Sequence, residues 1–580
     1  MRTISKPLRL IEVSFMMYFI FYTLVAIFIN QKTYPTQGVN DDEFFAHLVS
    51  GEFTGNRESF THISPASPQW FFGYLLTKFY LISSEHPWYY LVLLLTVLIS
   101  LSFMTIIVSN NFLALNQERI ILLILSILFL LWFVPSPTYT STAFISSFAG
   151  VIGFVFGIRN RFSNLYFIIP SVFLTWAMSI RTESFYATLL FFVPTIILWL
   201  VINRLLDIVL LKKLFIIIAL PFVVFSINIF KDYENFSQPG WREYRIFNEA
   251  RYAIQDNEAE RVISENPMEF GWTDTEYRLF DSYNFISPES FSGQKLKTIN
   301  DEYIAKSKKS TEINFEDLRK RWTTYFGPFY SVIYSSFFIF LYFIAYFSIR
   351  RETANALKFI LLSICSLLLN GILVVGITTF LRLPERIVFP IAFFFPVGIL
   401  LIASLFKTEN DKFQFKMISV LHLAGIASAY LIILLPSINH LYSLKINPAY
   451  TSFWGEQKLF FEKAADNKVL VGNASQFKSI WSNPYLKSAE KTKLSIYPLG
   501  WYTFSPYWTQ RGKLLGINES AVGYQLVNNP NLLWVSDDVI VKDLVDLIST
   551  QKSSQIDYLK LDSKSFDYGD YNIYSIVEKR

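Results

Sequence analysis

The chain has 580 residues, of which 52% are hydrophobic and only 17% charged, with a formal net charge of +5. Soluble domains carry about 25% charged residues, so this composition excludes an ordinary soluble protein and predicts a polytopic membrane protein. The modest net charge gives no reason to expect a nucleic-acid partner. The single cysteine, Cys365, excludes an intrachain disulfide and a cysteine-ligated metal site.

Long apolar runs predict about eleven transmembrane helices, because about 20 apolar residues cross a hydrocarbon core. We place them at residues 10–30, 87–108, 119–134, 139–158, 164–180, 184–203, 212–230, 326–349, 355–378, 386–406 and 415–436, the first being an uncleaved anchor. Basic residues next to the spans then fall on one side: Arg2, Lys6, Arg9, Arg159, Arg161, Arg204, Lys212, Lys213, Arg350, Arg351, Lys407, Lys412 and Lys416. The positive-inside rule makes this side the cytoplasm. We therefore expect a multi-pass cell-membrane protein with a cytoplasmic N-terminus and an extracytoplasmic C-terminus.

Three regions outside the membrane follow from this topology. The outer loops 31–86 and 231–325 belong to a transmembrane domain over residues 1–436, and residues 437–580 form a separate extracytoplasmic domain. In that domain KVLVGN (468–473) and NLLWVS (531–536) are typical of buried strands, DDVIVKDLVDLIST of a helix, and the last twenty or so residues of a hairpin. The predicted fold class is thus mainly α, with a small α/β domain at the C-terminus.

The first outer loop begins with an acidic pair. In NDDEFFAHLVSG the apolar residues repeat with helical spacing, Asn40 or Asp41 suits the N-cap, and Gly51 suits the end of the helix. This helix is too short to span the membrane, so we expect it to lie flat at the interface, as does a second helix at about 68–82. Asp41 and Asp42 are explained either as capping groups worth about 0.5–1 kcal/mol each or as functional carboxylates.

Two further outer segments carry aromatic and basic residues. WREYRIFNEARYAIQDNEAERVI, which contains Trp241, Tyr244 and Arg245, has helical patterning and is typical of a solvated helix resting on the membrane surface. YPLGWYTFSPYW (497–508) is densely aromatic. Its rings suit either stacking on sugar faces or an interfacial aromatic belt, and the belt is favoured.

Arginines at the outer ends of spans run against the usual charge bias. Arg181 and Glu183 lie between the fifth and sixth spans, and Arg382, Glu385 and Arg386 precede or begin the tenth: ITTFLRLPERIVFP. Such charges need compensation near a bilayer. Internal ion pairs supply one explanation, and an anionic lipid headgroup bound by guanidinium groups supplies the other.

Taken together, these features resemble the GT-C superfamily of membrane glycosyltransferases, which use polyprenyl-phosphate-linked sugars. The similar segments are NDDEFFAHLVSGEFTG, GWTDTEYRLFDSY (271–283) and GWYTFSPYW (500–508). The resemblance implies a GT-C-like bundle in which a first-loop Asp is the catalytic base or an acceptor-binding carboxylate. Asp41 and Asp42 both match that position, and Asp42 is preferred.

The same resemblance implies further roles. Arg382, Arg386 and, less closely, Arg181 correspond to residues that bind the lipid phosphate. His47, His62, Glu183 and Arg245 are candidates for acceptor binding or support, the two histidines because they lie in the same loop as the acids. We recognise no metal-binding set and no certain cofactor, and metal dependence stays an open alternative.

The residues suit an inverting transfer from a polyprenyl-phosphate sugar to a glycan, lipid or protein acceptor at the outer membrane face. A departing phosphate needs no protonation, so one carboxylate suffices as base. Three alternatives remain: a flippase or transporter for a lipid-linked saccharide, a polysaccharide polymerase of another fold, and an inactive GT-C relative. A transporter would favour charged residues at mid-membrane and repeated halves, and we find neither.

Overall fold

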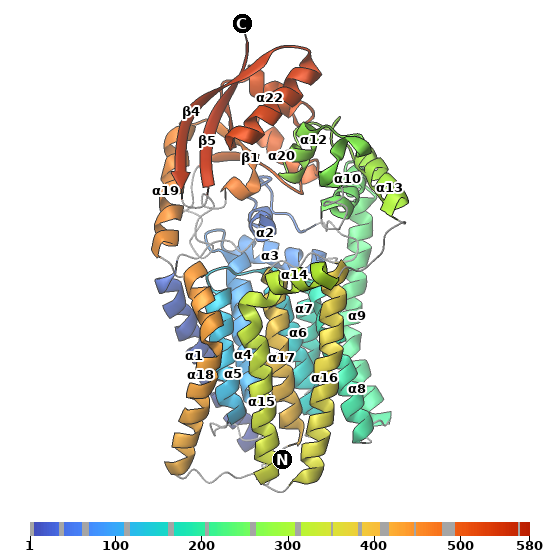
Figure 1. Ribbon diagram of the computed structural model, residues 1–580, viewed down its shortest axis with the longest axis vertical. Helices are drawn as coiled ribbons and strands as arrows, with labels where there is room; N and C mark the ends of the chain where they lie inside the picture. The colour runs from blue at the N-terminus through green and yellow to red at the C-terminus, as the bar shows by residue number, and fades with distance from the viewer. Residues whose placement is uncertain are drawn as a thin grey trace.

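The computed structural model describes residues 5–33, 40–60, 69–108, 117–159, 167–203, 208–255, 263–307, 315–349, 352–380, 385–406, 417–445, 448–477, 494–566 and 569–579. It shows a long helical bundle with a smaller assembly of helices and strands at one end (Figure 1). We call this end the domain end. The marks for the two chain termini lie at opposite ends of the long axis in Figure 1.

The bundle consists of α1 (Ser5–Lys32), α4 (Trp88–Ile107), α5 (Gln117–Phe133), α6 (Tyr139–Arg159), α7 (Ile168–Ile180), α8 (Thr182–Ile202), α9 (Ile208–Phe236), α15 (Tyr330–Ile349), α16 (Thr353–Phe380), α17 (Glu385–Phe406) and α18 (Met417–Lys445). Within the described ranges, nine helices are long and apolar enough to cross a membrane, and each coincides with a predicted span. The other two predicted spans, 119–134 and 164–180, are the shorter helices α5 and α7. The chain is therefore a polytopic membrane protein, as the sequence predicts.

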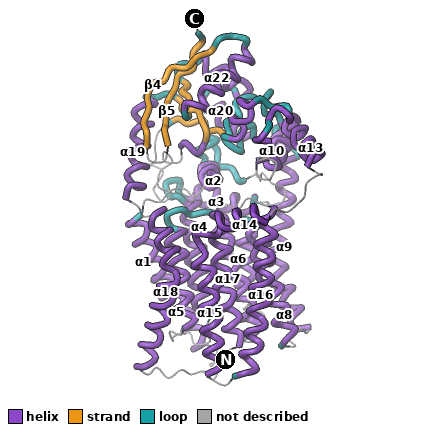
Figure 2. Tube along the Cα trace, in the orientation of Figure 1, coloured by secondary structure: helices purple, strands orange, loops and turns teal. Residues whose placement is uncertain are grey.

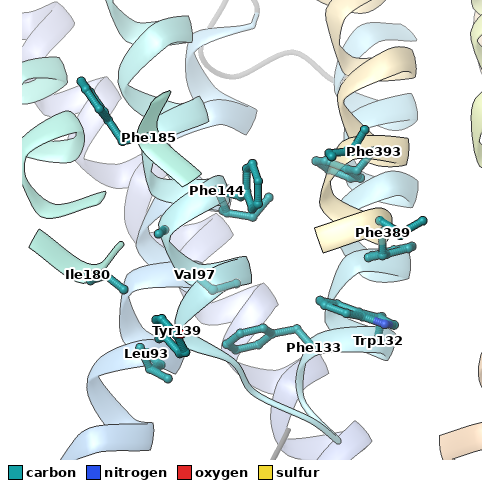
Figure 3. Close-up of a cluster of buried hydrophobic side chains, with 14 of the residues drawn as sticks. Leu93, Val97, Trp132, Phe133, Tyr139, Phe144, Ile180, Phe185, Phe389 and Phe393 are labelled. Atoms are coloured by element: carbon teal, nitrogen blue, oxygen red, sulfur yellow. The ribbon is translucent and has the colours of Figure 1, made fainter. Parts of the chain in front are cut away.

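Helices α6 and α17 form the centre of the bundle. Both are buried along nearly their whole length. Close packing against α6 depends on its glycines: a Cβ atom at Gly150 would lie 2.6 Å from Cγ of Leu174 in α7. Near the domain end, rings of α5 and α17 pack against each other, with Trp132 and Phe389 centroids 4.8 Å apart. Figure 3 shows this cluster with Tyr139, the first residue of α6, beside it. The central helices thus hold the start of α6 and the start of α17 firmly in place.

The segment 31–86, which keeps the name of first outer loop from the predicted topology, contains α2 (Asn40–Ser50) and α3 (Trp70–Ile82), as predicted, and Gly51 ends α2 with a φ of +85°. Residues 42–49 of α2 are all buried, so the helix is packed against protein, and its orientation relative to the membrane stays a prediction. The ring of Phe44 stacks on Tyr502 of the C-terminal region at 4.4 Å and 7°. Protein therefore surrounds α2 between the bundle and the C-terminal elements (Figure 1).

The remaining elements lie at the domain end. The second outer loop and its junction with the bundle hold α10 (Trp241–Gln255), α12 (Asp274–Asp281), α13 (Gly293–Ser307) and α14 (Phe315–Phe326). The C-terminal domain, by which we mean α19 onward, contains α19 (Pro448–Ala465), β1 (Val469–Asn473), β2 (Ser495–Leu499), α20 (Pro506–Leu515), α21 (Val522–Asn528), β3 (Leu532–Ser536), α22 (Asp538–Lys552), β4 (Ile556–Phe566) and β5 (Gly569–Glu578). The expected domain boundary at residue 436 falls inside α18.

The C-terminal strands form one mixed sheet in the order β2-β1-β3-β5-β4. β1 pairs in parallel with β2 and β3, while β5 is antiparallel to β3 and β4. The strands, drawn in orange in Figure 2, lie at the domain end. The predicted strands at 468–473 and 531–536, the helix after them and the closing hairpin are confirmed. Apolar side chains of α19 and the central strands pack into a second small core, which includes Phe461, Leu470 and Val535.

The aromatic residues of the two aromatic segments pack against each other. In helix α10, Trp241 packs on Tyr507 with centroids 4.6 Å apart, and Phe247 packs on Phe504 at 5.1 Å, while the expectation that this helix rests on a membrane surface stays a prediction. The rings of residues 501–508 therefore form a buried contact with α2 and α10 and not an interfacial belt. Burial removes these rings from water as effectively as lipid contact does.

Candidate active site at the domain end of the bundle

Three helix starts meet at the domain end. The first turn of α2 carries Asp41 and Asp42, α6 begins at Tyr139, and the first turn of α17 carries Arg386. The hydroxyl of Ser141 in α6 donates to the backbone carbonyl of Arg386 at 3.2 Å, which joins the two central helices here. Helix N-termini carry partial positive charge, so this junction favours anions.

Both carboxylate oxygens of Asp41 are engaged by other parts of the chain. Nη1 of Arg386 lies 3.2 Å from Oδ2 of Asp41. The indole Nε1 of Trp501, in the C-terminal domain, donates to Oδ1 at 2.7 Å. The Asp41 and Arg386 side chains are 21% and 20% exposed, so the ion pair faces partly toward solvent. An exposed carboxylate on α2 is thereby tied to the bundle and to the C-terminal domain at once.

Asp42 lies next to this pair but is completely buried. Its Oδ1 accepts hydrogen bonds from the Tyr89 hydroxyl at 2.7 Å and from the backbone N–H of Tyr139 at 2.8 Å. Its Oδ2 is buried and has no hydrogen-bond partner among the residues that the structure describes. Burial raises the pKa of Asp42 to about 7, although its two donors and the charge of Arg386 oppose that rise. Asp42 is thus an oriented carboxylate with one open oxygen.

The two described arginines of the site differ in how many of their guanidinium N–H groups already have an acceptor. Nε of Arg386 is buried and finds no hydrogen-bond partner within the described ranges. Arg181 donates from Nη1 to the Tyr139 hydroxyl at 2.9 Å and to Oγ1 of Thr140 at 2.5 Å, and its Nε lies 3.5 Å from Glu183. Tyr139 therefore links Arg181 to Asp42. We call Asp41, Asp42, Arg181 and Arg386 the carboxylate–arginine cluster.

The other predicted site residues fall into two groups. Arg382 and His62 lie outside the described residues. His47 shares α2 with the acids, but its Nδ1 pairs with Glu52. Arg245 pairs with Glu249 one turn along α10, at the exposed surface of that helix. Glu183 is placed beside Arg181, so the internal pairing considered from sequence is observed there.

Three residues of the site were not predicted. Tyr89 and Tyr139 contact Asp42 from α4 and α6, and Trp501 contacts Asp41 from the C-terminal domain. Trp501 lies in GWYTFSPYW, a segment singled out by sequence but without a role in the site. Nothing in the local sequence distinguishes Tyr89 or Tyr139 from other aromatic residues at span ends.

The described part of the chain contains no group of three or more His, Cys, Asp or Glu side chains arranged to hold a metal ion. The chemistry that the cluster itself offers is a poised carboxylate beside two guanidinium groups. Such a set can remove a proton from a neutral hydroxyl and can bind an anion at the same place.

Comparison with known proteins gives one distant likeness to report. No family model matches the sequence, and no curated protein matches it. Among solved structures, the chain is similar to ArnT from Cupriavidus metallidurans in the apo state, over 97% of this chain and 98% of that chain, with a TM-score of 0.38 and 10% identity. At this TM-score and identity the likeness supports no statement about activity, so the functional inference rests on the carboxylate–arginine cluster.

Proposed function

We propose that this chain is a membrane glycosyltransferase of the GT-C type. In this proposal it moves a sugar from a polyprenyl-phosphate donor in the membrane to a glycan, lipid or protein acceptor at the outer face. One observation carries the proposal: a buried carboxylate with an open oxygen lies beside an arginine with an open N–H, at the end of a transmembrane bundle. The carboxylate suits the acceptor hydroxyl that must lose a proton, and the arginine suits the phosphate of the donor.

Asp42 is the proposed base. Oδ2 takes the proton of the acceptor hydroxyl while the acceptor oxygen attacks the anomeric carbon. A pKa of about 7 suits this task, because a general base works best when its pKa lies near the operating pH. Asp41 is less suited, since Arg386 and Trp501 already occupy its two oxygens.

Arg386 is the proposed phosphate-binding group, with Arg181 as its partner. As the bond from the anomeric carbon to the phosphate oxygen breaks, its electron pair stays on that oxygen. The guanidinium charge stabilises the polyprenyl phosphate that leaves. Direct displacement by the acceptor inverts the anomeric centre. Membrane lipids hold the donor where the start of α17 can reach its phosphate.

The test uses the purified full chain with a panel of polyprenyl-phosphate hexoses and pentoses, and it measures release of polyprenyl phosphate. Asp42→Asn is expected to lower turnover by about 10²–10⁴-fold, the usual contribution of a general base. Asp41→Asn is expected to have a smaller effect. Asp546→Asn, an exposed carboxylate on α22, is the matched control and should leave turnover unchanged.

Binding is measured separately from turnover, because an inactive relative would still bind the lipid. Polyprenyl phosphate should raise the Tm of the wild type and should raise that of Arg386→Gln much less. Binding without release from any donor would identify a non-catalytic lipid-binding protein. Unchanged turnover in both the Asp42→Asn and Asp41→Asn variants would remove the carboxylate from the mechanism.

A further inference from the structure

A single turn of the C-terminal domain enters the candidate site. Residues 500–505, between β2 and α20, carry Trp501, whose indole N–H donates to Asp41. The next ring, Tyr502, is buried and stacks on Phe44 of α2. Trp501 also meets the Phe44 ring edge to face at 5.1 Å. Residues 500–505 therefore contact α2 at positions no more than three residues from Asp41 and Asp42.

The turn is built to hold one shape. Thr503 is fully buried; its N–H donates to the Gly500 carbonyl at 3.0 Å, and its hydroxyl accepts from the Gly500 N–H at 2.9 Å. Phe504 has a φ of +66°, in the left-handed region that a non-glycine residue occupies at a cost. Ser505 then caps α20 by accepting from the N–H of Trp508. The hydrogen bonds of Thr503 and Ser505 offset this strain, and they hold the turn in the conformation that directs the Trp501 indole toward Asp41.

A second contact ties the same domain to the end of α2. Nη1 of Arg511 in α20 donates to the carbonyl of Glu52 at 3.2 Å, while its Nε and Nη2 donate to the carbonyl of Ile496 in β2. Tyr507 donates its hydroxyl proton to the carbonyl of Ser59 at 2.7 Å. The C-terminal domain thus holds the first outer loop at several points, and Trp501 is the contact that reaches a carboxylate of the cluster.

We propose that Trp501 is a positioning residue through which the C-terminal domain completes the active site. Its indole N–H holds Oδ1 of Asp41, so that Asp41 offers only Oδ2 to Arg386. Arg386 then keeps its Nε free for the phosphate of the donor. This inference rests on the proposed function, because it assigns Arg386 to phosphate.

Without the indole N–H, we expect Asp41 to compete with the donor phosphate for Arg386. In Trp501→Phe the freed Oδ1 of Asp41 can turn to Nε of Arg386 and form a bidentate pair, the favoured geometry for a guanidinium and a carboxylate. The donor phosphate must then displace Asp41. We expect the KM for the donor to rise about tenfold, consistent with one charge-assisted hydrogen bond, and kcat at saturating donor to change little.

The control is Trp508→Phe, which makes the same substitution in the same domain. The Trp508 indole N–H donates to the backbone carbonyl of Pro498 at 3.1 Å and makes no contact with the cluster. This variant is expected to lower Tm and to leave the donor KM unchanged. If Trp501 had only a structural role, both variants would have a lower Tm and a smaller fraction of active molecules, and both would keep the donor KM of the wild type.

A double-mutant cycle completes the test. Without an oxygen acceptor on the side chain of residue 41 there is nothing for the indole N–H to bind, so adding Trp501→Phe to Asp41→Ala should leave the donor KM where Asp41→Ala sets it. If the wild type transfers sugar and Trp501→Phe keeps the wild-type KM, the positioning role is overturned while the proposed function stands.

If no donor supports transfer by the wild type, the proposed function fails. The Trp501–Asp41 contact is then judged from Tm alone. Tm losses of the two single variants that do not add in the double variant support the tie between the C-terminal domain and α2. Losses that add overturn it.

Discussion

The ionisation of Asp42 predicts how its replacement changes stability with pH. In the folded chain burial raises the pKa of this carboxyl from its ordinary value of 3.8 to about 7. Between these pH values the unfolded chain releases the proton and the folded chain retains it. The folded state therefore loses stability as pH rises from about 4 to about 7, and the cost of ionising the buried group is fully present above pH 7.

The size of this cost follows from the two pKa values. At 1.36 kcal/mol per pKa unit, the whole difference corresponds to about 4 kcal/mol, of which about 3 kcal/mol develops between pH 5 and pH 8.5. Asp42→Asn has no such term. Its amide N–H₂ would replace the unpartnered Oδ2, which costs about 1–3 kcal/mol at every pH. Relative to the wild type, the variant should therefore gain about 3 kcal/mol of stability between pH 5 and pH 8.5, and it should be the more stable of the two at pH 8.5.

The assay is thermal unfolding of the purified chain in detergent across this pH range. With an unfolding entropy of about 2.1 cal/mol/K per residue over 580 residues, about 3 kcal/mol corresponds to a change of about 2–3 °C in the Tm difference between variant and wild type. Effects of all other groups cancel in that difference. Asp546→Asn, on the exposed side of α22, is the control substitution measured alongside. A Tm difference for Asp42→Asn that does not change from pH 5 to pH 8.5 would refute a buried, proton-retaining Asp42.

Three further predictions concern activity and packing. If Asp42 is the base, kcat/KM should fall about tenfold per pH unit well below pH 7, and a profile that is flat down to pH 5 contradicts that role. Arg278 in the second outer loop makes a bidentate pair with Asp543 of the C-terminal domain, whose side chain is 3% exposed. Arg278→Ala leaves this buried carboxylate without its partner and should therefore lower Tm more than Asp543→Asn does. The reverse order of the two Tm values would be inconsistent with the burial of Asp543. Gly150→Ala places a Cβ 2.6 Å from a leucine of α7 and should lower the free energy of unfolding by about 1–3 kcal/mol. Gly398→Ala, whose Cβ would have its nearest neighbour at 3.4 Å, should be neutral or stabilising. Equal Tm values for the two variants would argue against tight packing between α6 and α7.

Local patterns were sufficient for most of the fold. A transmembrane helix must satisfy its backbone internally and present apolar side chains, so a hydropathy run predicts it without knowledge of its neighbours. The same holds for strands such as Leu532–Ser536, whose residues are all buried. β2 was missed because Pro498 interrupts the pattern. A proline is tolerated there because β2 is an edge strand of the sheet.

Long-range contacts explain what the local patterns of α2 and of the aromatic run could not predict. The sequence of α2 has an apolar face and a charged start, as an interfacial helix would. Its burial depends on Tyr502, which lies 458 residues further along the chain and stacks on Phe44. Neither segment alone reveals the other. The aromatic run at 497–508 looked like a membrane belt for the same reason, since burial in lipid and burial in protein select the same rings.

The candidate site was predictable where charge was unexpected. Arg386 stands out because an arginine at the outer end of a span runs against the usual charge bias, and Asp42 stands out through the resemblance of the first loop to that of GT-C enzymes. Their partners do not stand out: Tyr89 acts through an ordinary hydroxyl, and Tyr139 binds Asp42 through its backbone N–H, which every non-proline residue has. Sequence thus predicted the charged members of the cluster and could not predict the groups that orient them.

The geometry of one helical turn separates the two neighbouring acids. Successive residues of an α-helix point about 100° apart, so Asp41 and Asp42 cannot face the same group. The side chain of Asp41 points to Arg386 and Trp501, and its two oxygens are both used. The side chain of Asp42 points to the start of α6, where two donors hold one oxygen and leave the other open. A pair that is indistinguishable in sequence therefore divides into a carboxylate that orients an arginine and a carboxylate that can accept a proton. Exchanging either one for Asn should consequently impair different steps, donor binding for Asp41 and proton removal for Asp42.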